Sequence, residues 1–178
     1  MILETERLEL RVIQKRDIPL IHQNIFSDKS VMKFALSETI FSLKETREFI
    51  DKYFLKDIYS KIGLCPIFLK DENKLIGLAG VMEFKYLNQR EYEFGFIIAK
   101  KFQGQGYATE IGKAQINFAF NELKLQNIFA LTNRENISSK NVLNKLKMKY
   151  ISDINREDRG IREVFQLENI NHKGKKCK

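Results

Sequence analysis

Two glycines follow an apolar stretch at a point where a helix is expected to begin. The apolar stretch is Glu93–Ile98, and Gly104 and Gly106 come after it with one residue between them. Glycine destabilises a helix by roughly 1 kcal/mol relative to alanine, so this position calls for a compensating role. The first amides of a helix have no partners within it, and the helix dipole makes them attractive to anions. The spacing therefore predicts a loop whose backbone wraps around a phosphate.

The residues around the glycines distinguish between three known sequence patterns of phosphate-binding loops. The nucleotide pattern G-x-x-x-x-G-K-[ST] fails because no lysine follows Gly106. The dinucleotide pattern G-x-G-x-x-G has Thr109 in its last glycine position, and several antiparallel-looking strands precede the loop. The pattern that fits is Q-x-x-G-x-A, which runs from Gln103 to Ala108.

This loop resembles the acetyl-CoA diphosphate loop of the GNAT N-acetyltransferase superfamily. Its extension G-Y-A-T-E, Gly106 to Glu110, is similar to the Rim-type branch, which includes ribosomal-protein N-acetyltransferases. Further stretches occur in the family's order: TERLELR at the start, EFGF before the loop and NRENISSKNVLNKL after it. The resemblance implies acetyl transfer from acetyl-CoA to a primary amine by direct attack in a ternary complex. The acceptor would be a protein N-terminus or a small amine such as a polyamine or an aminoglycoside.

The resemblance also implies which residues bind acetyl-CoA. Pantetheine would lie in a V-shaped gap between the strand Glu91–Ala99 and the strand Ile128–Thr132, and backbone amides of the loop would hold the diphosphate. Lysine side chains would meet the adenosine phosphates, with ordinary surface charges as the alternative; these are Lys100, Lys101 and Lys140. The expected cofactor-binding residues are Phe96, Ile97, Ile98, Gln103, Gly104, Gln105, Gly106, Tyr107, Ala108, Asn136 and Lys140. No metal is expected.

The reaction needs a base, because a primary amine is mostly protonated at pH 7. Glu93 is expected to be this base, since it occupies the acidic position before the glycine of the family's E-[IF]-G-[YF] strand; Glu83 is the second candidate. Ser139 is expected to return a proton to the thioester sulfur, with a helix N-cap as its competing role, and Asn136 has the same competing role.

Two departures from the family pattern keep a second hypothesis open. Many relatives place a tyrosine acid four residues beyond the serine, where this chain has Leu143. The later K-x-G-F signature reads Lys145-Leu146-Lys147-Met148. A CoA-binding or regulatory module that keeps the fold without the activity is therefore the alternative to an enzyme.

Periodicity along the chain predicts the order strand, two helices, three strands, helix, strand, helix, two strands. The strand Arg7–Val12 alternates, Asp17 is expected to cap the first helix, and Ser42–Glu45 forms a capping box before the second. This order indicates an α+β fold with a mixed, mostly antiparallel GNAT-like sheet, splayed between its two central strands and flanked by about four helices. Residues 1–168 are expected to form one acetyltransferase domain, and 169–178 a basic, disordered tail.

Composition limits the partners. The net charge is +8, but the last ten residues hold four lysines and no acid, so half of it lies there. An anionic small ligand explains the rest, and nucleic acid is not expected to be the main ligand. No apolar run approaches the roughly 18 residues of a membrane span, and the N-terminus, charged by its fourth residue, is not expected to be a signal peptide. We expect a cytoplasmic monomer or homodimer, with Cys65 buried and Cys177 in the tail.

The acceptor is expected to bind between the helical region Phe34–Tyr59 and the closing hairpin Ile154–Arg162. Acidic residues in the helical region could attract a cationic acceptor or be ordinary surface charges; they are Glu38, Asp51 and Asp57. The sequence does not choose between these alternatives.

Overall fold

The computed structural model of the chain describes residues 2–36, 38–54, 62–157 and 159–170. The strands are β1 (Leu3–Glu4), β2 (Leu8–Leu10), β3 (Gly63–Leu69), β4 (Lys74–Tyr86), β5 (Gln89–Ile98), β6 (Asn127–Thr132), β7 (Lys149–Arg156) and β8 (Gly160–Glu168). The α-helices are α1 (Asp17–Ile21), α2 (Lys29–Met32), α3 (Leu43–Tyr53), α4 (Tyr107–Asn121) and α5 (Ile137–Lys145). Two further helical segments differ from the α-helix in their winding. They are η1, a wider π-helix (His22–Phe26), and η2, a tighter 3-10 helix (Lys100–Phe102).

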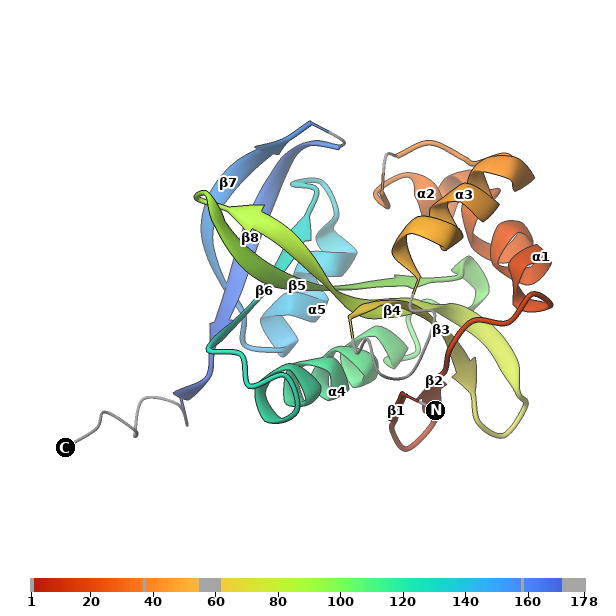
Figure 1. Cartoon of the computed structure of the whole chain (residues 1–178), viewed down its shortest axis with the longest axis horizontal. Coiled ribbons are helices and arrows are strands. Elements are labelled where there is room, and N and C mark those ends of the chain that lie inside the picture. The colour runs from red at the N-terminus through yellow and green to blue at the C-terminus, as the bar shows by residue number, and fades with distance from the viewer. Residues whose placement is uncertain (1, 37, 55–61, 158, 171–178) are drawn as a thin grey trace.

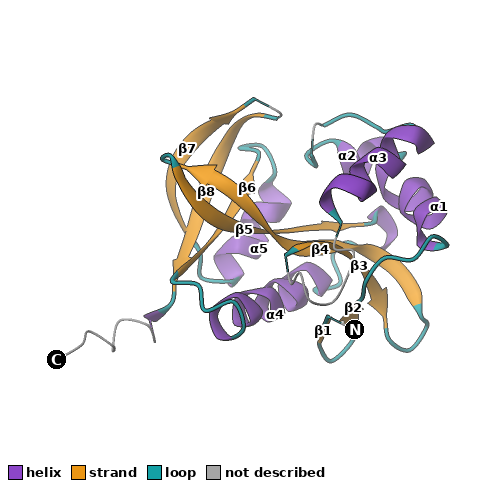
Figure 2. Cartoon of the chain, viewed as in Figure 1, coloured by secondary structure: helices purple, strands orange, loops and turns teal. Residues whose placement is uncertain are grey.

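The described strands form a single sheet in the order β1-β2-β3-β4-β5-β6-β8-β7. All neighbours are antiparallel except β5 and β6, which run parallel. Helices α1 to α3 lie on one side of the β3–β4 part of the sheet and α4 lies on the other (Figures 1 and 2). The predicted α+β class and the mixed, mostly antiparallel sheet are thus confirmed.

The two central strands separate after a short contact. Their pairing register consists of one residue pair, Glu93 with Phe129. Beyond this pair β5 continues to Ile98 against β4 alone, while β6 stays paired with β8 up to Thr132. The predicted V-shaped splay therefore opens at Glu93 and widens toward the glycine loop.

The structure contains two short elements that periodicity did not predict. β1 pairs with β2 over two residues, and α2 has four residues capped by Asp28, whose carboxylate accepts from the amides of Ser30 (2.8 Å) and Val31 (3.3 Å). Neither is long enough to show a hydrophobic period. The part of the chain that is described therefore has five α-helices where about four were expected.

The two predicted helix starts have different outcomes. The Ser42 hydroxyl accepts from the Glu45 amide (3.2 Å), and the Glu45 carboxylate accepts from the Ser42 amide (2.7 Å), so the capping box is confirmed. The prediction that Asp17 is an N-cap is wrong, because Asp17 is the first helical residue of α1 and Arg16 is the N-cap. The buried Asp17 carboxylate instead accepts from the Gln14 amide at 2.8 Å, which closes the turn before the helix.

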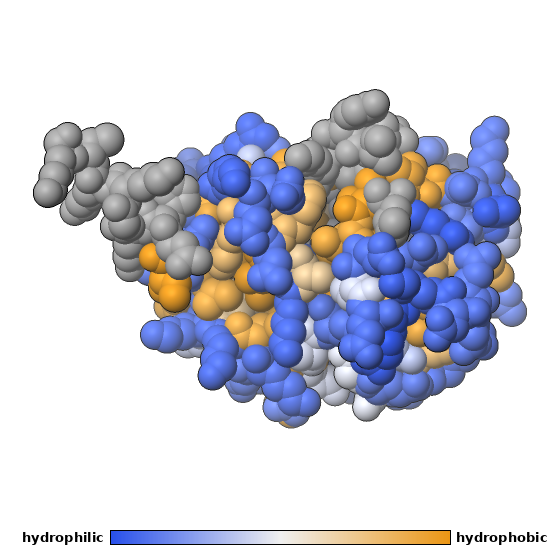
Figure 3. Space-filling model, turned by 90° about the horizontal axis from the view of Figure 1, so that it is seen from below, coloured by the Kyte–Doolittle hydropathy of each residue, from blue (hydrophilic) through white to orange (hydrophobic). Residues whose placement is uncertain are grey.

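Two large clusters of apolar side chains fill the space around the sheet. One lies around β2 to β4 with α1, η1 and α3, and the other lies between α4, α5, β6 and β8. Cys65 belongs to the first cluster, and its burial raises the pKa of its thiol to about 12, so it stays protonated. Viewed from below, hydrophilic residues surround several hydrophobic patches (Figure 3), as on most folded domains. None of the described helices has the length and apolar character needed to cross a membrane.

The described chain remains bonded to the domain beyond the expected boundary at residue 168. The Asn169 amide donates to the Gln126 carbonyl at 2.8 Å, and its side chain donates to the Leu125 carbonyl at 3.4 Å. The rest of the expected tail 169–178, namely residues 171–178 with Cys177, lies outside the described residues.

Close packing of β3 against β4 makes one glycine in β4 a test of the fold. A Cβ on Gly80 would lie 2.0 Å from the backbone oxygen of Gly63. We expect Gly80→Ala to lower the free energy of unfolding by about 2 kcal/mol or more, because backbone must move to admit the methyl group. Urea unfolding measures this. Gly95→Ala is the control, since its Cβ would meet only the flexible end of Met82 at 3.3 Å. Equal urea midpoints for the parent and Gly80→Ala would contradict the described packing.

Candidate functional site

The loop between β5 and α4 has the conformation that its glycines predict. Gly104 has φ +80° and Gly106 has φ +86°, a region that L side chains rarely adopt. A Cβ on Gly104 would meet nothing within 4 Å. Glycine is therefore needed there for its backbone conformation, because the space itself is open.

The amides of this loop form an anion cradle. The Glu110 amide is the first that donates back along the helix, to the Gly106 carbonyl at 3.0 Å. Within the described residues, the amides from Gly104 to Ala108 have no protein acceptor, and no side chain caps α4. Residues 103–106 are exposed. Exposed amides without acceptors at a helix N-terminus suit the diphosphate of acetyl-CoA.

Two glutamine side chains hold the loop. Gln103 Nε2 donates to the carbonyl of Ile98, the last residue of β5, at 2.9 Å. Gln105 Nε2 donates to the Lys101 carbonyl at 3.2 Å. The first residue of the Q-x-x-G-x-A pattern thus uses its side chain to tie the loop to the end of the strand.

The backbone of β5 beyond Glu93 borders the gap. Phe96, Ile97 and Ile98 pair with Ala79, Leu78 and Gly77 of β4, and their other edge has no strand partner. Phe96 and Ile97 are half-buried, while Ile98 is buried. Unpaired backbone groups at this edge fit the amide groups of a pantetheine arm, as in other strand-addition contacts.

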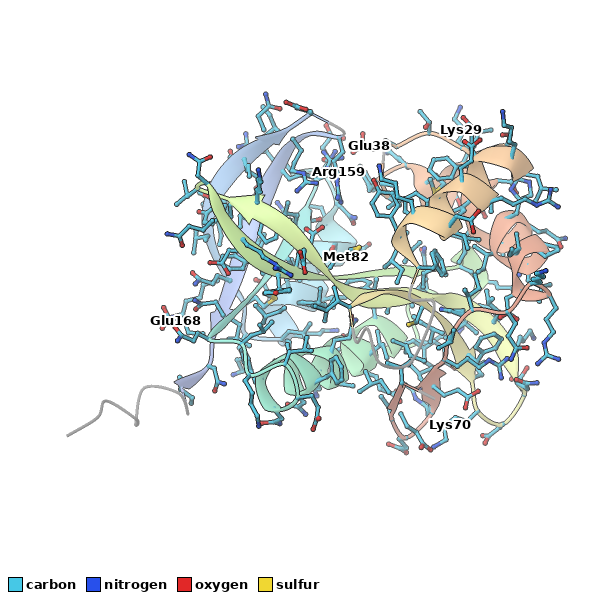
Figure 4. The ribbon with its side chains drawn as sticks, viewed as in Figure 1. Lys29, Glu38, Lys70, Met82, Arg159 and Glu168 are labelled. Carbon is cyan, nitrogen blue, oxygen red and sulfur yellow. The ribbon has the colours of Figure 1, made fainter. Side chains whose placement is uncertain are left out.

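Glu93 lies where the two central strands part. Its side chain is 6% exposed, and the Arg159 guanidinium lies 3.4 Å from its Oε1. Arg159 belongs to the turn before β8, so the closing hairpin reaches the predicted base. Figure 4 shows Arg159 and Glu38 between this hairpin and the α2–α3 region. The Glu93 carboxylate thus lies where the splay opens, and its role as the base stays a prediction.

The second candidate base lies on the other face of the sheet. Met82 is directly opposite Glu93 in the β4–β5 register, so the two share a face, and Glu83 points away from it. The Glu83 carboxylate pairs with Arg90 near the β4–β5 turn, and its side chain is 41% exposed. Glu83 therefore does not join Glu93 in one site.

The start of α5 separates the roles expected for Asn136 and Ser139. Asn136 is the N-cap, and its Oδ1 accepts from the Ser139 amide at 3.1 Å. The competing N-cap role of Ser139 is therefore wrong, and within the described residues its half-buried hydroxyl has no hydrogen-bond partner. The cap leaves the Nδ2 group of Asn136 for a ligand.

Two other side chains on α5 make contacts within the protein, one in an ion pair and one in the apolar core. Lys140 Nζ lies 3.2 Å from a carboxylate oxygen of Glu163 on β8, so a phosphate contact would require it to leave this ion pair. Leu143, at the place of the family's tyrosine, is 1% exposed in the second apolar cluster.

Lys100 and Lys101, the other lysines expected near the adenosine phosphates, are exposed on η2, close to the loop in sequence.

The acceptor side contains an open hollow of about 740 Å³ between α2 and the β6–α5 connection. Charges of both signs line it, among them Lys29, Lys33 and Glu38. Glu38 accepts from Arg162 (2.7 Å) and from Asn133 (2.8 Å), so its charge is neutralised by the closing hairpin. Of the other acids considered in this region, Asp51 is exposed on α3 and Asp57 lies outside the described residues.

Three arginines at the site escaped the sequence analysis: Arg7, Arg159 and Arg162. Arginines are numerous in this basic chain, and no spacing marks these three as partners of distant acids. TERLELR contains Arg7, but the sequence offers no reason for it to meet the glycine loop. Among the described residues, no group of three or more His, Cys, Asp or Glu side chains is placed to hold a metal ion.

Known proteins are similar to this chain in sequence and in fold. The family described as Acetyltransferase (GNAT) domain matches residues 7–149. An uncharacterized N-acetyltransferase of Bacillus subtilis, YnaD, is 32% identical over 149 residues, which cover 84% of this chain and 83% of YnaD. Spermidine N(1)-acetyltransferase of Vibrio cholerae is 28% identical over 123 residues, 69% of this chain and 68% of that protein.

Solved structures agree with the sequence matches. A GNAT-family acetyltransferase from Bacillus anthracis superposes with a TM-score of 0.77 at 28% identity, covering 94% of this chain and 98% of the other. RimL, a ribosomal L7/L12 alpha-N-protein acetyltransferase solved with coenzyme A, has a TM-score of 0.76 at 17% identity, covering 94% and 97%, which shows a shared fold. Since the family match extends over most of the chain and includes the splay and the cradle, the chain belongs to the GNAT family and is an acetyl-CoA-dependent N-acetyltransferase.

Proposed function

We propose that this enzyme transfers the acetyl group to a primary amine by direct attack in a ternary complex, and that the amine is a protein N-terminus or a small molecule. The observation that carries the proposal is the position of Glu93. Its buried carboxylate lies where the gap between β5 and β6 opens, and it also meets Arg159 of the closing hairpin. A donor in the gap and an acceptor beneath the hairpin would therefore meet at this carboxylate.

Each residue has a defined task in this mechanism. The amides of Gly104 to Ala108 hold the diphosphate, and the free edge of β5 with the Nδ2 group of Asn136 binds pantetheine. Acetyl-CoA supplies the activated thioester. Glu93 removes a proton from the acceptor ammonium, directly or through water, so that the neutral amine attacks the carbonyl carbon. A β5 amide stabilises the developing oxyanion, and binding both substrates together supplies proximity.

The Ser139 hydroxyl gives a proton to the departing thiolate, directly or through water, and regains the proton that the attacking nitrogen loses as it becomes an amide. Ser139→Ala is expected to lower kcat about 10²-fold, the low end of general-acid effects, with CoA affinity nearly unchanged. Steady-state kinetics and calorimetry measure the two quantities. Ser138→Ala is the matched control, because Ser138 is an exposed serine on the same helical turn. A Ser139→Ala enzyme with the parent kcat would place the proton donor elsewhere.

The proposal leaves the identity of the acceptor amine to experiment. Relatives act on different amines, since one is named a spermidine N-acetyltransferase and a structural neighbour a ribosomal-protein acetyltransferase. A screen that measures free CoA thiol with polyamines, aminoglycosides, amino acids and N-terminal peptides tests this directly. Turnover with one class assigns the acceptor.

The alternative kept open by the sequence, a CoA-binding module that has lost the family's activity, is an outcome of the same screen. The observation that favours it is the burial of Leu143 where relatives have a tyrosine acid, because α5 then supplies no phenol to the site. Tight CoA binding without thiol release on any amine or peptide of the screen would support the module.

A further inference from the structure

The TERLELR stretch has no part in the mechanism above, yet the structure places it against the glycine loop. Its first three residues form the turn between β1 and β2, and the next three are β2. Two residues of the turn contact Glu110 in the first turn of α4. Thr5 Oγ1 donates to Glu110 Oε1 at 2.5 Å, and the Arg7 amide donates to the same oxygen at 3.0 Å. Arg7 Nε and Nη2 lie 2.7 Å and 2.6 Å from Glu110 Oε2. The carboxylate of Glu110 thus anchors the Arg7 side chain.

The anchored guanidinium also contacts the cradle. Arg7 Nη1 donates to the carbonyl oxygen of Gln105 at 3.2 Å. The guanidinium carbon lies 4.5 Å from the centre of the Tyr107 ring. Arg7 Nη2 is 3.5 Å from the place that a Cβ on Gly106 would occupy. One side chain from the N-terminal turn therefore contacts three consecutive residues of the loop.

The contact with Gln105 determines where an amide of the cradle points. A peptide unit is planar and trans, so its C=O and N–H point in opposite directions. Holding the Gln105 carbonyl against Arg7 therefore directs the Gly106 N–H away from Arg7. Rotation of this peptide changes ψ of Gln105 and φ of Gly106. Gly106 has φ +86° and, without a side chain, offers little resistance to that rotation. Without a fixed partner for the carbonyl, the peptide could turn over and remove an N–H from the cradle.

We propose that Arg7 is a positioning residue for the diphosphate loop: held by Glu110 and Thr5, it fixes the 105–106 peptide so that the cradle is formed before acetyl-CoA binds. The proposal rests on the assignment of the cradle to the diphosphate. It also gives Glu110, an acid in the first turn of α4, a specific task.

The state of the Glu110 carboxylate is consistent with this task. Partial burial raises its pKa, but the hydrogen bonds from Thr5 and Arg7 outweigh that effect, and the net pKa is lowered from the usual 4.5. The carboxylate is therefore ionised at neutral pH, when it can hold the guanidinium through two charge-assisted hydrogen bonds.

A direct phosphate contact by Arg7 is the alternative, and Glu110→Gln separates the two. If Arg7 acts by positioning, loss of its anchor weakens CoA binding. If Arg7 binds the phosphate itself, removal of the competing carboxylate leaves CoA affinity unchanged or improves it. An affinity for CoA that equals or exceeds the parent value in Glu110→Gln would overturn the positioning role.

The binding experiment compares CoA with pantetheine, which lacks the diphosphate. We expect Arg7→Gln to raise the Kd for CoA about tenfold or more, the equivalent of about 1.4 kcal/mol, and to leave the Kd for pantetheine unchanged. Arg7→Lys should restore part of the loss. Lys70→Gln is the control, since Lys70 donates to the Thr5 carbonyl at 3.0 Å in the same turn and does not touch the loop. Equal losses for CoA and pantetheine, or parent affinity in Arg7→Gln, would refute the proposal.

A second measurement on the free protein needs no ligand. In the NMR spectrum, the Gly106 and Tyr107 amides of the parent should give single sharp signals, and in Arg7→Gln they should broaden or double as the peptide rotates. Unchanged signals in the variant would overturn the proposal. This result stands even if the parent fails to bind CoA, an outcome that would reject the cofactor assignment instead. The Arg7→Lys and Glu110→Gln spectra serve the same purpose if Arg7→Gln does not fold.

Discussion

Gly106→Asp is expected to abolish acetyl-CoA binding. The new carboxylate would lie beside the backbone amides from Gly104 to Ala108, which have no acceptor among the described residues. Two unit charges 4 Å apart interact by about 4 kcal/mol at an effective dielectric constant of 20, so repulsion from the diphosphate should raise the Kd on the order of 100-fold or more. The carboxylate would also lie near Arg7 and compete for it with Glu110. Isothermal titration calorimetry measures the loss.

Gly106→Asn and Gly104→Ala separate charge from backbone strain. Asparagine has the shape of aspartate without its charge and tolerates positive φ better than most residues, so it should retain much of the affinity. Gly104→Ala adds only conformational strain, because its Cβ would meet nothing within 4 Å. If Gly106→Asp bound CoA as tightly as the parent, the loop would not be the diphosphate site.

Glu93→Gln is expected to lower kcat by about 10²–10⁴-fold, the usual contribution of a general base, while the Kd for CoA stays close to the parent value. The amide has the shape of the carboxylate but cannot accept the ammonium proton. The dependence of the rate on pH should change as well, because the group that takes the ammonium proton is gone. Steady-state rates across pH, with calorimetry for CoA, measure both effects.

Glu83→Gln is the matched control for this prediction. Glu83 is on the adjacent strand but on the opposite face of the sheet, paired with Arg90. It should retain the parent rate and pH profile. A Glu93→Gln enzyme that is folded and shows the parent pH–rate profile would mean that the base is elsewhere or that water alone serves.

The part of this site that the sequence predicts is the part built from neighbours in the chain. The glycine spacing, the helix after it and the capping box at Ser42 each depend on interactions within a few residues, so the residue types are enough to predict them. The order of the elements along the chain followed from periodicity, and the splay followed from the resemblance to a family. Where the local signal was weak, as for the short elements β1 and α2, prediction failed.

Contacts between residues far apart in the chain were decided by the tertiary structure alone. The sequence named Glu93 and Glu83 together, and only the register of β4 on β5 showed that they face opposite sides of the sheet. Asparagine and serine both suit a helix start, and only the geometry of α5 assigned the cap to Asn136, whose side chain accepts from the Ser139 amide.

The arginines illustrate the physical reason for this division. Arg7 meets Glu110 across 103 positions of the chain, and Arg162 meets Glu38 across 124. An ion pair at such a separation forms because the sheet and helices bring the two charges together, and neither residue carries a local mark of its partner. The sequence by itself therefore determined the glycine loop and the helix that follows it. The tertiary structure decided which charges surround that loop, which carboxylate lies where β5 and β6 part, and which distant side chain contacts the loop.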